Sequence, residues 1–184
     1  MSRHHNDYPD GTACFWTSSV VGCVPIFKSP TAAKLLLGLW EKYRVLYGVK
    51  ILGYVIMPDH FHVVIWSDMG EDTQRFLKRT LSLASVELGK LVERAAAKGE
   101  PQSIFWLKVF QSHAGTGSRL AIWKERGRAF PAISGDVLRQ KLNYIHENPV
   151  RKCLVEQPDD WVFSSASWYT SGSGPMTLDI VNGW

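Results

Sequence analysis

Hydrophobic residues recur along this chain with two spacings, and each spacing is typical of one kind of secondary structure. Runs rich in β-branched and aromatic residues indicate strands, whereas apolar residues three or four positions apart indicate one face of a helix. The predicted segments are a strand at 13–21, a helix at 30–47, strands at 49–57 and 60–66, a helix at 73–98 and a strand at 104–111. This β-α-β-β-α-β order predicts an α+β fold of the ferredoxin-like kind, an antiparallel sheet with its helices mainly on one face.

Beyond this core the pattern is less regular. Residues 112–118 read as a Gly-rich loop and residues 122–131 as an irregular basic segment. Ser134 is expected to cap a C-terminal helix over residues 135–148. That helix should end at Asn148, because Pro149 disfavours helical geometry in the residue before it.

Length and composition predict one globular domain. The chain has 184 residues, of which 45% are hydrophobic and 21% charged, as in an ordinary globular protein. We expect a single domain over residues 1–184, with a core at about 13–170 and frayed N- and C-terminal ends. The three cysteines lack C-x-x-C spacing, which argues against a disulfide framework and a thiolate zinc site. With no apolar leader or membrane span in the sequence, a cytoplasmic location without a membrane partner is expected.

Positive charge is concentrated in one part of the chain. Residues 108–152 carry nine basic and three acidic side chains, so this segment has a charge of +6 while the whole chain has +4. Segregated positive charge favours a partner rich in phosphate. A solvated basic face without a partner is the alternative that charge alone leaves open.

Two histidines flank one apolar residue at the start of the strand predicted at 60–66. Because side chains on a strand alternate between its two faces, His60 and His62 should leave the same face side by side. Neighbouring neutral imidazoles suit a divalent cation, which accepts both nitrogens as ligands. The spacing alone also fits two partly exposed histidines that bind nothing.

The predicted C-terminal helix carries a second candidate group. Tyr144 and Asn148 are four positions apart and therefore lie on one helical face, where a phenol and a carboxamide could meet the same metal-bound phosphate. His146 and Glu147 are alternative ligands, but their positions two and three residues after Tyr144 direct their side chains less well toward the same site. A buried helix aromatic at Tyr144 and a helix cap at Asn148 are the alternatives without chemistry.

Several blocks of sequence occur together in a distinctive order. They are Met57-Pro58-Asp59-His60-Phe61-His62, Tyr144-Ile145-His146-Glu147-Asn148-Pro149-Val150, Leu154-Val155, Trp161 and Ser164-Ser165, with Phe15-Trp16-Thr17 and Phe27 near the start. This combination resembles the IS200-like, REP-associated tyrosine transposases, which are Y1 HUH single-strand endonucleases. The resemblance covers about residues 13–170, although residues 105–131 match loosely and Cys153 stands where glycine is expected.

The resemblance implies a specific chemistry. Tyr144 would be the nucleophile of a metal-dependent single-strand DNA endonuclease and strand transferase that forms a 5′-phosphotyrosine intermediate. His60, His62 and Asn148 would hold the metal, Mg²⁺ or Mn²⁺. A tyrosine hydroxyl is a poor nucleophile at neutral pH. A divalent ion that binds the phosphate and stabilises the leaving oxygen would compensate for this weakness.

The implied partner is single-stranded or hairpin DNA, such as a repetitive extragenic palindrome or the end of a mobile element. The protein would be nucleoid-associated and act as a monomer or homodimer. The side chains expected to contact DNA are Arg139, Lys141, Arg151 and Lys152. The alternative functions are a non-catalytic ferredoxin-like protein that binds RNA or hairpin DNA, and a metal hydrolase that uses bound water instead of tyrosine.

Overall fold

The computed structural model describes residues 8–124, 128–132 and 134–181, and within them four strands form one antiparallel sheet. The strands are β1 (Thr12–Ser19), β2 (Lys50–Ile56), β3 (His60–Ser67) and β4 (Arg128–Ala132), in the spatial order β2-β3-β1-β4. The helices are α1 (Pro30–Tyr47), α2 (Gly70–Ala97), α3 (Pro101–Ser112), α4 (Gly135–Arg151) and α5 (Ala166–Ser171). Short 3₁₀ turns lie at Val21–Cys23, Ile26–Lys28 and Pro158–Asp160. The predicted α+β, ferredoxin-like architecture is confirmed.

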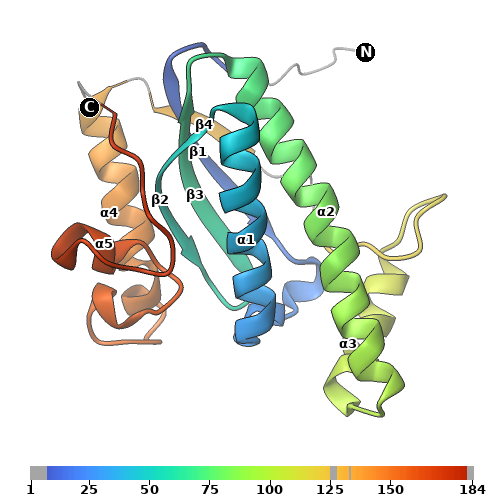
Figure 1. Ribbon diagram of the computed structural model, residues 1–184. Helices are drawn as coiled ribbons and strands as arrows, with labels where there is room; N and C mark the ends of the chain where they lie inside the picture. The colour runs from blue at the N-terminus through green and yellow to red at the C-terminus, as the bar shows by residue number, and fades with distance from the viewer. Residues whose placement is uncertain (1–7, 125–127, 133, 182–184) are drawn as a thin grey trace.

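The sheet is covered on both faces. Helices α1 and α2 lie on one face, and α4 lies on the other (Figure 1). Alternate residues of the central strands enter two separate hydrophobic clusters, so that Trp16 and Phe61 pack on the α1 and α2 side while Phe15 and Val64 pack on the α4 side. His62 has the same strand parity as Val64 and therefore faces α4. None of the helices in the described part of the chain is long and apolar enough to cross a membrane.

The predicted strand at 104–111 is wrong, because this segment belongs to helix α3. Pro101 occupies the first turn of the helix, a position that needs no backbone N–H donor. Ser103 and Phe110, seven positions apart, are buried, and α3 packs against α2. Aromatic content alone suggested a strand, but burial at this spacing requires a helix.

The edge strand next to β1 comes instead from the segment predicted to be irregular. Strand β4 pairs antiparallel with β1, and Phe15 lies opposite Phe130. The short β4 sequence carries no periodic signal of its own. Its pairing with an otherwise unpaired edge of β1 supplies the backbone hydrogen bonds that make it a strand.

Helix α4 extends past the predicted end at Asn148 and continues through Pro149 to Arg151, so the predicted boundary is wrong. Pro149 has no N–H to donate, yet its side chain is buried within the fold. Beyond it, Lys152 N–H donates to the Asn148 carbonyl at 3.1 Å and Leu154 N–H to the Pro149 carbonyl at 2.9 Å. These bonds satisfy carbonyls of the last turn. At the other end, the Ser134 side chain caps the helix as predicted, accepting a hydrogen bond from Val137 N–H at 3.3 Å.

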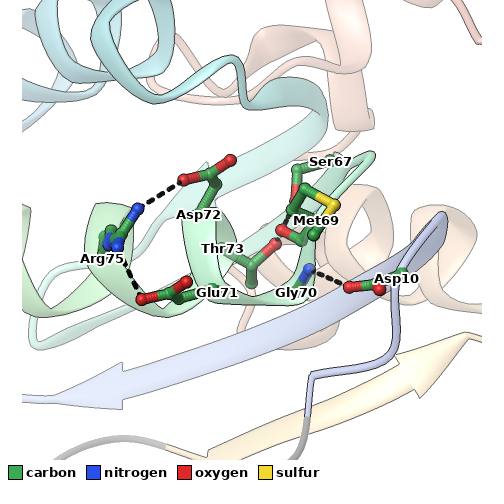
Figure 2. Close-up of polar contacts among 8 residues, drawn as sticks. All are labelled: Asp10, Ser67, Met69, Gly70, Glu71, Asp72, Thr73 and Arg75. Atoms are coloured by element: carbon green, nitrogen blue, oxygen red, sulfur yellow. Dashed lines mark hydrogen bonds and ion pairs between the residues drawn. The ribbon is translucent and has the colours of Figure 1, made fainter.

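The start of α2 is fastened to the segment that precedes β1 (Figure 2). The Gly70 N–H donates to Asp10 Oδ1 at 2.7 Å, and the Ser67 hydroxyl lies 2.8 Å from the Thr73 hydroxyl. A side chain at Gly70 would collide with the Tyr8 carbonyl oxygen, so this close approach requires glycine. The contacts set the direction in which α2 leaves the end of β3.

Candidate functional site

The two histidines at the start of β3 lie side by side on the face that α4 covers. Their ring centroids are 5.0 Å apart at an interplanar angle of 78°. The Nδ1 atom of each ring is held by an oxygen: Asp59 Oδ1 lies 2.7 Å from His60 Nδ1, and Thr17 Oγ1 lies 2.7 Å from His62 Nδ1. Each imidazole therefore keeps Nε2 as its remaining nitrogen. A histidine that binds a metal through one ring nitrogen is commonly oriented by an oxygen hydrogen-bonded to the other.

His62 is suited to be a neutral ligand. Only 5% of the residue is exposed, and its Nε2 atom is buried without a hydrogen-bond partner among the described residues. Burial, together with the smaller effects of the neighbouring His60 and Lys141, lowers the pKa of His62 to about 3. His62 therefore stays uncharged near neutral pH and retains the lone pair that a cation would accept.

Helix α4 places four polar side chains on one face. Lys141, Tyr144, Asn148 and Arg151 follow one another at spacings of three, four and three residues, which align along a helix. The Tyr144 ring is 39% exposed and lies 5.4 Å from the His62 ring, measured between centroids. Tyr144 and the histidines thus come together within a single chain.

Asn148 lies one turn beyond Tyr144 and is almost fully buried, with 5% exposed. Its Nδ2 atom has no hydrogen-bond partner in the described part of the chain. Because the oxygen and nitrogen of an amide exchange places by rotation, this side chain could present its oxygen to a cation. His146 is instead engaged elsewhere, with its Nε2 atom 2.8 Å from the Ser165 hydroxyl.

His60 and His62 need further, uncharged or substrate-derived ligands to hold a metal ion. Across residues 8–124, 128–132 and 134–181, no three His, Cys, Asp or Glu side chains gather closely enough to hold one. An ion at His60 and His62 would therefore need the Asn148 amide, water or substrate oxygens to complete its coordination. Two imidazoles, an amide and open positions suit Mg²⁺ or Mn²⁺ bound together with a phosphate.

Two of the four basic residues predicted to contact DNA lie beside Tyr144. The Arg151 guanidinium is 5.5 Å from the Tyr144 ring centroid, and Lys141 Nζ is 4.9 Å from the Phe15 ring centroid. Neither has a carboxylate partner among the described residues. Arg139, in contrast, forms an ion pair with Asp136 on the exposed side of α4. Lys152 follows the last helical residue and is exposed, without a contact to these rings.

Sequence reasoning missed the residues that orient the histidines. Asp59 adjoins His60, so its position next to a candidate ligand was a usable signal. Thr17 belongs to a block that shares in the family resemblance, but the sequence does not place it beside His62, which it meets only through the pairing of β1 with β3. Phe15 was also missed as a site residue, although its ring stacks on His62 at 5.3 Å and meets the Tyr144 ring edge-on at 6.0 Å.

Comparison with known proteins gives a likeness in structure only. No protein-family model and no curated protein sequence matches the chain. Among solved structures, that of a REP-associated tyrosine transposase bound to a REP hairpin superposes with a TM-score of 0.62. The two share 19% sequence identity, and the match covers 100% of this chain and 95% of the other. At this identity the comparison establishes a shared fold over the whole chain.

Proposed function

We propose that this protein is a transposase-like, metal-dependent single-strand DNA endonuclease and strand transferase acting on single-stranded or hairpin DNA. The observation that carries the proposal is the approach of Tyr144 to His62, with ring centroids 5.4 Å apart, from segments far apart in the sequence. The shared fold with a tyrosine transposase bound to a REP hairpin supports hairpin DNA as the class of substrate.

His60 and His62 would hold the divalent ion through their Nε2 atoms, with Asn148 as a third ligand. Asp59 and Thr17 keep the two rings in the orientation that this requires. Once bound, Mg²⁺ or Mn²⁺ would polarise the scissile phosphate and stabilise the leaving 3′ oxygen. Lys141 and Arg151, which have no carboxylate partners among the described residues, would offset the charge of the DNA backbone on either side of Tyr144.

The covalent step proposed for Tyr144 is a phosphoryl transfer. The Tyr144 hydroxyl oxygen loses its proton to solvent and bonds to phosphorus, and the bond from phosphorus to the 3′ oxygen breaks. The leaving oxygen takes up a proton, which gives a free 3′-OH and a 5′-phosphotyrosine. Attack by a 3′-OH on the phosphotyrosine reverses the step and joins the strands. Tyr144 is exposed enough for a strand to reach it.

The test is the covalent adduct itself. Wild-type protein is incubated with Mn²⁺ and a labelled pool of hairpin oligonucleotides with single-stranded flanks, and adducts are resolved on a denaturing gel. The adduct should form with wild-type protein and be absent from Tyr144→Phe. Tyr47→Phe, on α1 across the sheet, is the matched control and should keep it.

Three other results would each contradict this proposal. Cleavage that survives Tyr144→Phe without an adduct would identify water as the nucleophile. Binding of hairpin DNA without cleavage would identify a non-catalytic binding protein. A lack of both binding and adduct across the whole pool would exclude DNA as the substrate.

A further inference from the structure

A half-exposed aromatic ring lies next to the Tyr144 site without an assigned role. Phe130 on β4 is 49% exposed. It is the cross-strand partner of Phe15, and their ring centroids are 6.4 Å apart. Residues directly opposite each other on neighbouring strands share a face of the sheet, so Phe130 lies on the same face as the histidines.

Lys141 adds a positive charge to this aromatic surface. Its Nζ atom lies 4.9 Å from the Phe15 ring centroid and 5.9 Å from that of Phe130. With no carboxylate partner among the described residues, the ammonium is available to an anion. An exposed aromatic face beside a free cation is the combination by which proteins hold unpaired nucleotides, through base stacking and phosphate contact.

The surface is continuous with the proposed catalytic residue. Phe15 is nearly buried and bridges the two exposed rings, since it contacts Tyr144 at 6.0 Å on one side and Phe130 at 6.4 Å on the other. A strand whose phosphate reaches Tyr144 would therefore carry a neighbouring base over Phe130. Phe105 on α3 is more exposed, at 62%, but among the described residues it has no aromatic or cationic neighbour of this kind.

We propose that Phe130 is a stacking platform for one unpaired nucleobase of the DNA strand that enters the site, and that Lys141 binds an adjoining phosphate. The nature of the ligand rests on the proposed function. Because every base has a π face, the platform holds the strand in place without selecting its sequence. It acts as a positioning element for the phosphate presented to Tyr144.

The test separates base contacts from phosphate contacts. Binding is measured by fluorescence anisotropy in EDTA, which prevents metal-dependent cleavage, on two labelled probes. Both are the same hairpin; one has a single-stranded flank of about ten thymidines and the other a flank of about ten base-free tetrahydrofuran residues. Wild-type protein should prefer the thymidine probe. Phe130→Ala should weaken binding to that probe by about tenfold and leave binding to the base-free probe within about twofold.

Matched variants isolate the π face and the charge. Phe130→Leu keeps apolar bulk and should lose most of the preference for bases, whereas Phe130→Trp should keep it. Phe105→Ala should bind both probes as the wild type does. Lys141→Gln should weaken both probes and reduce the salt dependence of binding by about one phosphate contact. Urea midpoints of the variants verify that each is folded.

Several outcomes would overturn the platform. One is that Phe130→Ala weakens binding to the two probes equally, or weakens binding to neither. Another is that the wild-type protein binds the thymidine and base-free probes with equal affinity. The Mn²⁺ adduct assay distinguishes this failure from that of the proposed function. Adducts without base discrimination would refute the platform alone, and base discrimination by Phe130 without adducts would refute the nuclease alone.

Discussion

Replacing Ser165 by alanine should destabilise the protein by about 2–4 kcal/mol, because one buried hydroxyl joins α4 to strand β2. The Ser165 hydroxyl donates to the Tyr54 carbonyl at 3.1 Å. It accepts from the Tyr54 N–H at 2.8 Å and from His146 Nε2 at 2.8 Å. Since a hydroxyl has one proton and two lone pairs, this pattern uses it fully and requires the proton of His146 on Nε2.

The magnitude follows from which partners the substitution leaves unpaired. The Tyr54 carbonyl keeps its bond from the Ser165 backbone N–H at 2.9 Å and loses little. The Tyr54 N–H lies in a fully buried residue and would lose its acceptor, at a cost of about 1–3 kcal/mol. The His146 N–H would also lose its acceptor, but this residue is partly exposed and can reach water, so its share is about 1 kcal/mol.

Urea unfolding followed by tryptophan fluorescence measures the effect. With a slope of about 2 kcal/mol/M, the midpoint should fall by about 1–2 M while the slope stays unchanged. The control is Ser171→Ala, an exposed serine whose loss should change the free energy of unfolding by at most about 0.5 kcal/mol. In a double-mutant cycle, His146→Phe should show a coupling with Ser165→Ala of about 1 kcal/mol.

A free energy of unfolding for Ser165→Ala within about 0.5 kcal/mol of the wild type would refute the reasoning. It would mean that the buried Tyr54 donor has another acceptor. Retained stability together with loss of the coupling to His146 would show that the hydroxyl does not join α4 to the sheet at all.

Three further predictions concern acid stability, backbone packing and metal affinity. Burial lowers the pKa of His146 to about 4, below its ordinary value of about 6.5, so the unfolded chain binds the extra proton between these values. The contribution of His146 to the free energy of unfolding should be constant above that window, fall by roughly 2–3 kcal/mol as pH decreases through it and level off below it. Urea titrations of His146→Phe should therefore show a shallower loss of stability with decreasing pH than the wild type, and an identical profile would contradict the assignment. Gly70→Ala should lower the free energy of unfolding, measured by calorimetry, by about 1–3 kcal/mol, because the new methyl group would collide with the Tyr8 carbonyl oxygen. Gly115→Ala places its methyl group in open space and should leave the free energy of unfolding unchanged. Asp59→Ala should weaken Mn²⁺ binding about 10- to 100-fold, measured by isothermal titration calorimetry in the absence of DNA. Asp68→Ala, which removes an exposed carboxylate, is the control. Equal Mn²⁺ affinities of the two variants would show that Asp59 does not orient His60.

Local periodicity alone was enough to predict the long helices and the hairpin. The apolar stripe ending at Gly48 corresponds to α1, and Gly48 takes the left-handed conformation that ends it. The two strands around Pro58-Asp59 pair as an antiparallel hairpin. Each of these features depends on residues close together in sequence, whose geometry the backbone itself determines.

The same local rules assembled each half of the candidate site separately. Two histidines at i and i+2 share a strand face, and residues at i and i+4 share a helix face, whatever the rest of the fold does. The sequence therefore placed His60 beside His62 and Tyr144 in line with Asn148. It could not place one pair against the other, since that contact depends on where α4 docks on the sheet.

Only the tertiary structure decided the features that depend on distant partners. Residues 104–111 are helical because they pack on α2, and 128–132 form a strand because β1 offers a free edge. Helix α4 runs past Pro149 because packing and last-turn hydrogen bonds outweigh a local bias against helix. Thr17 reaches His62 through strand register, and Lys141 rather than Arg139 joins the site through the rotation of α4 on the sheet. Sequence spacing determines which side chains share a face, whereas burial of those faces against one another determines which of them meet.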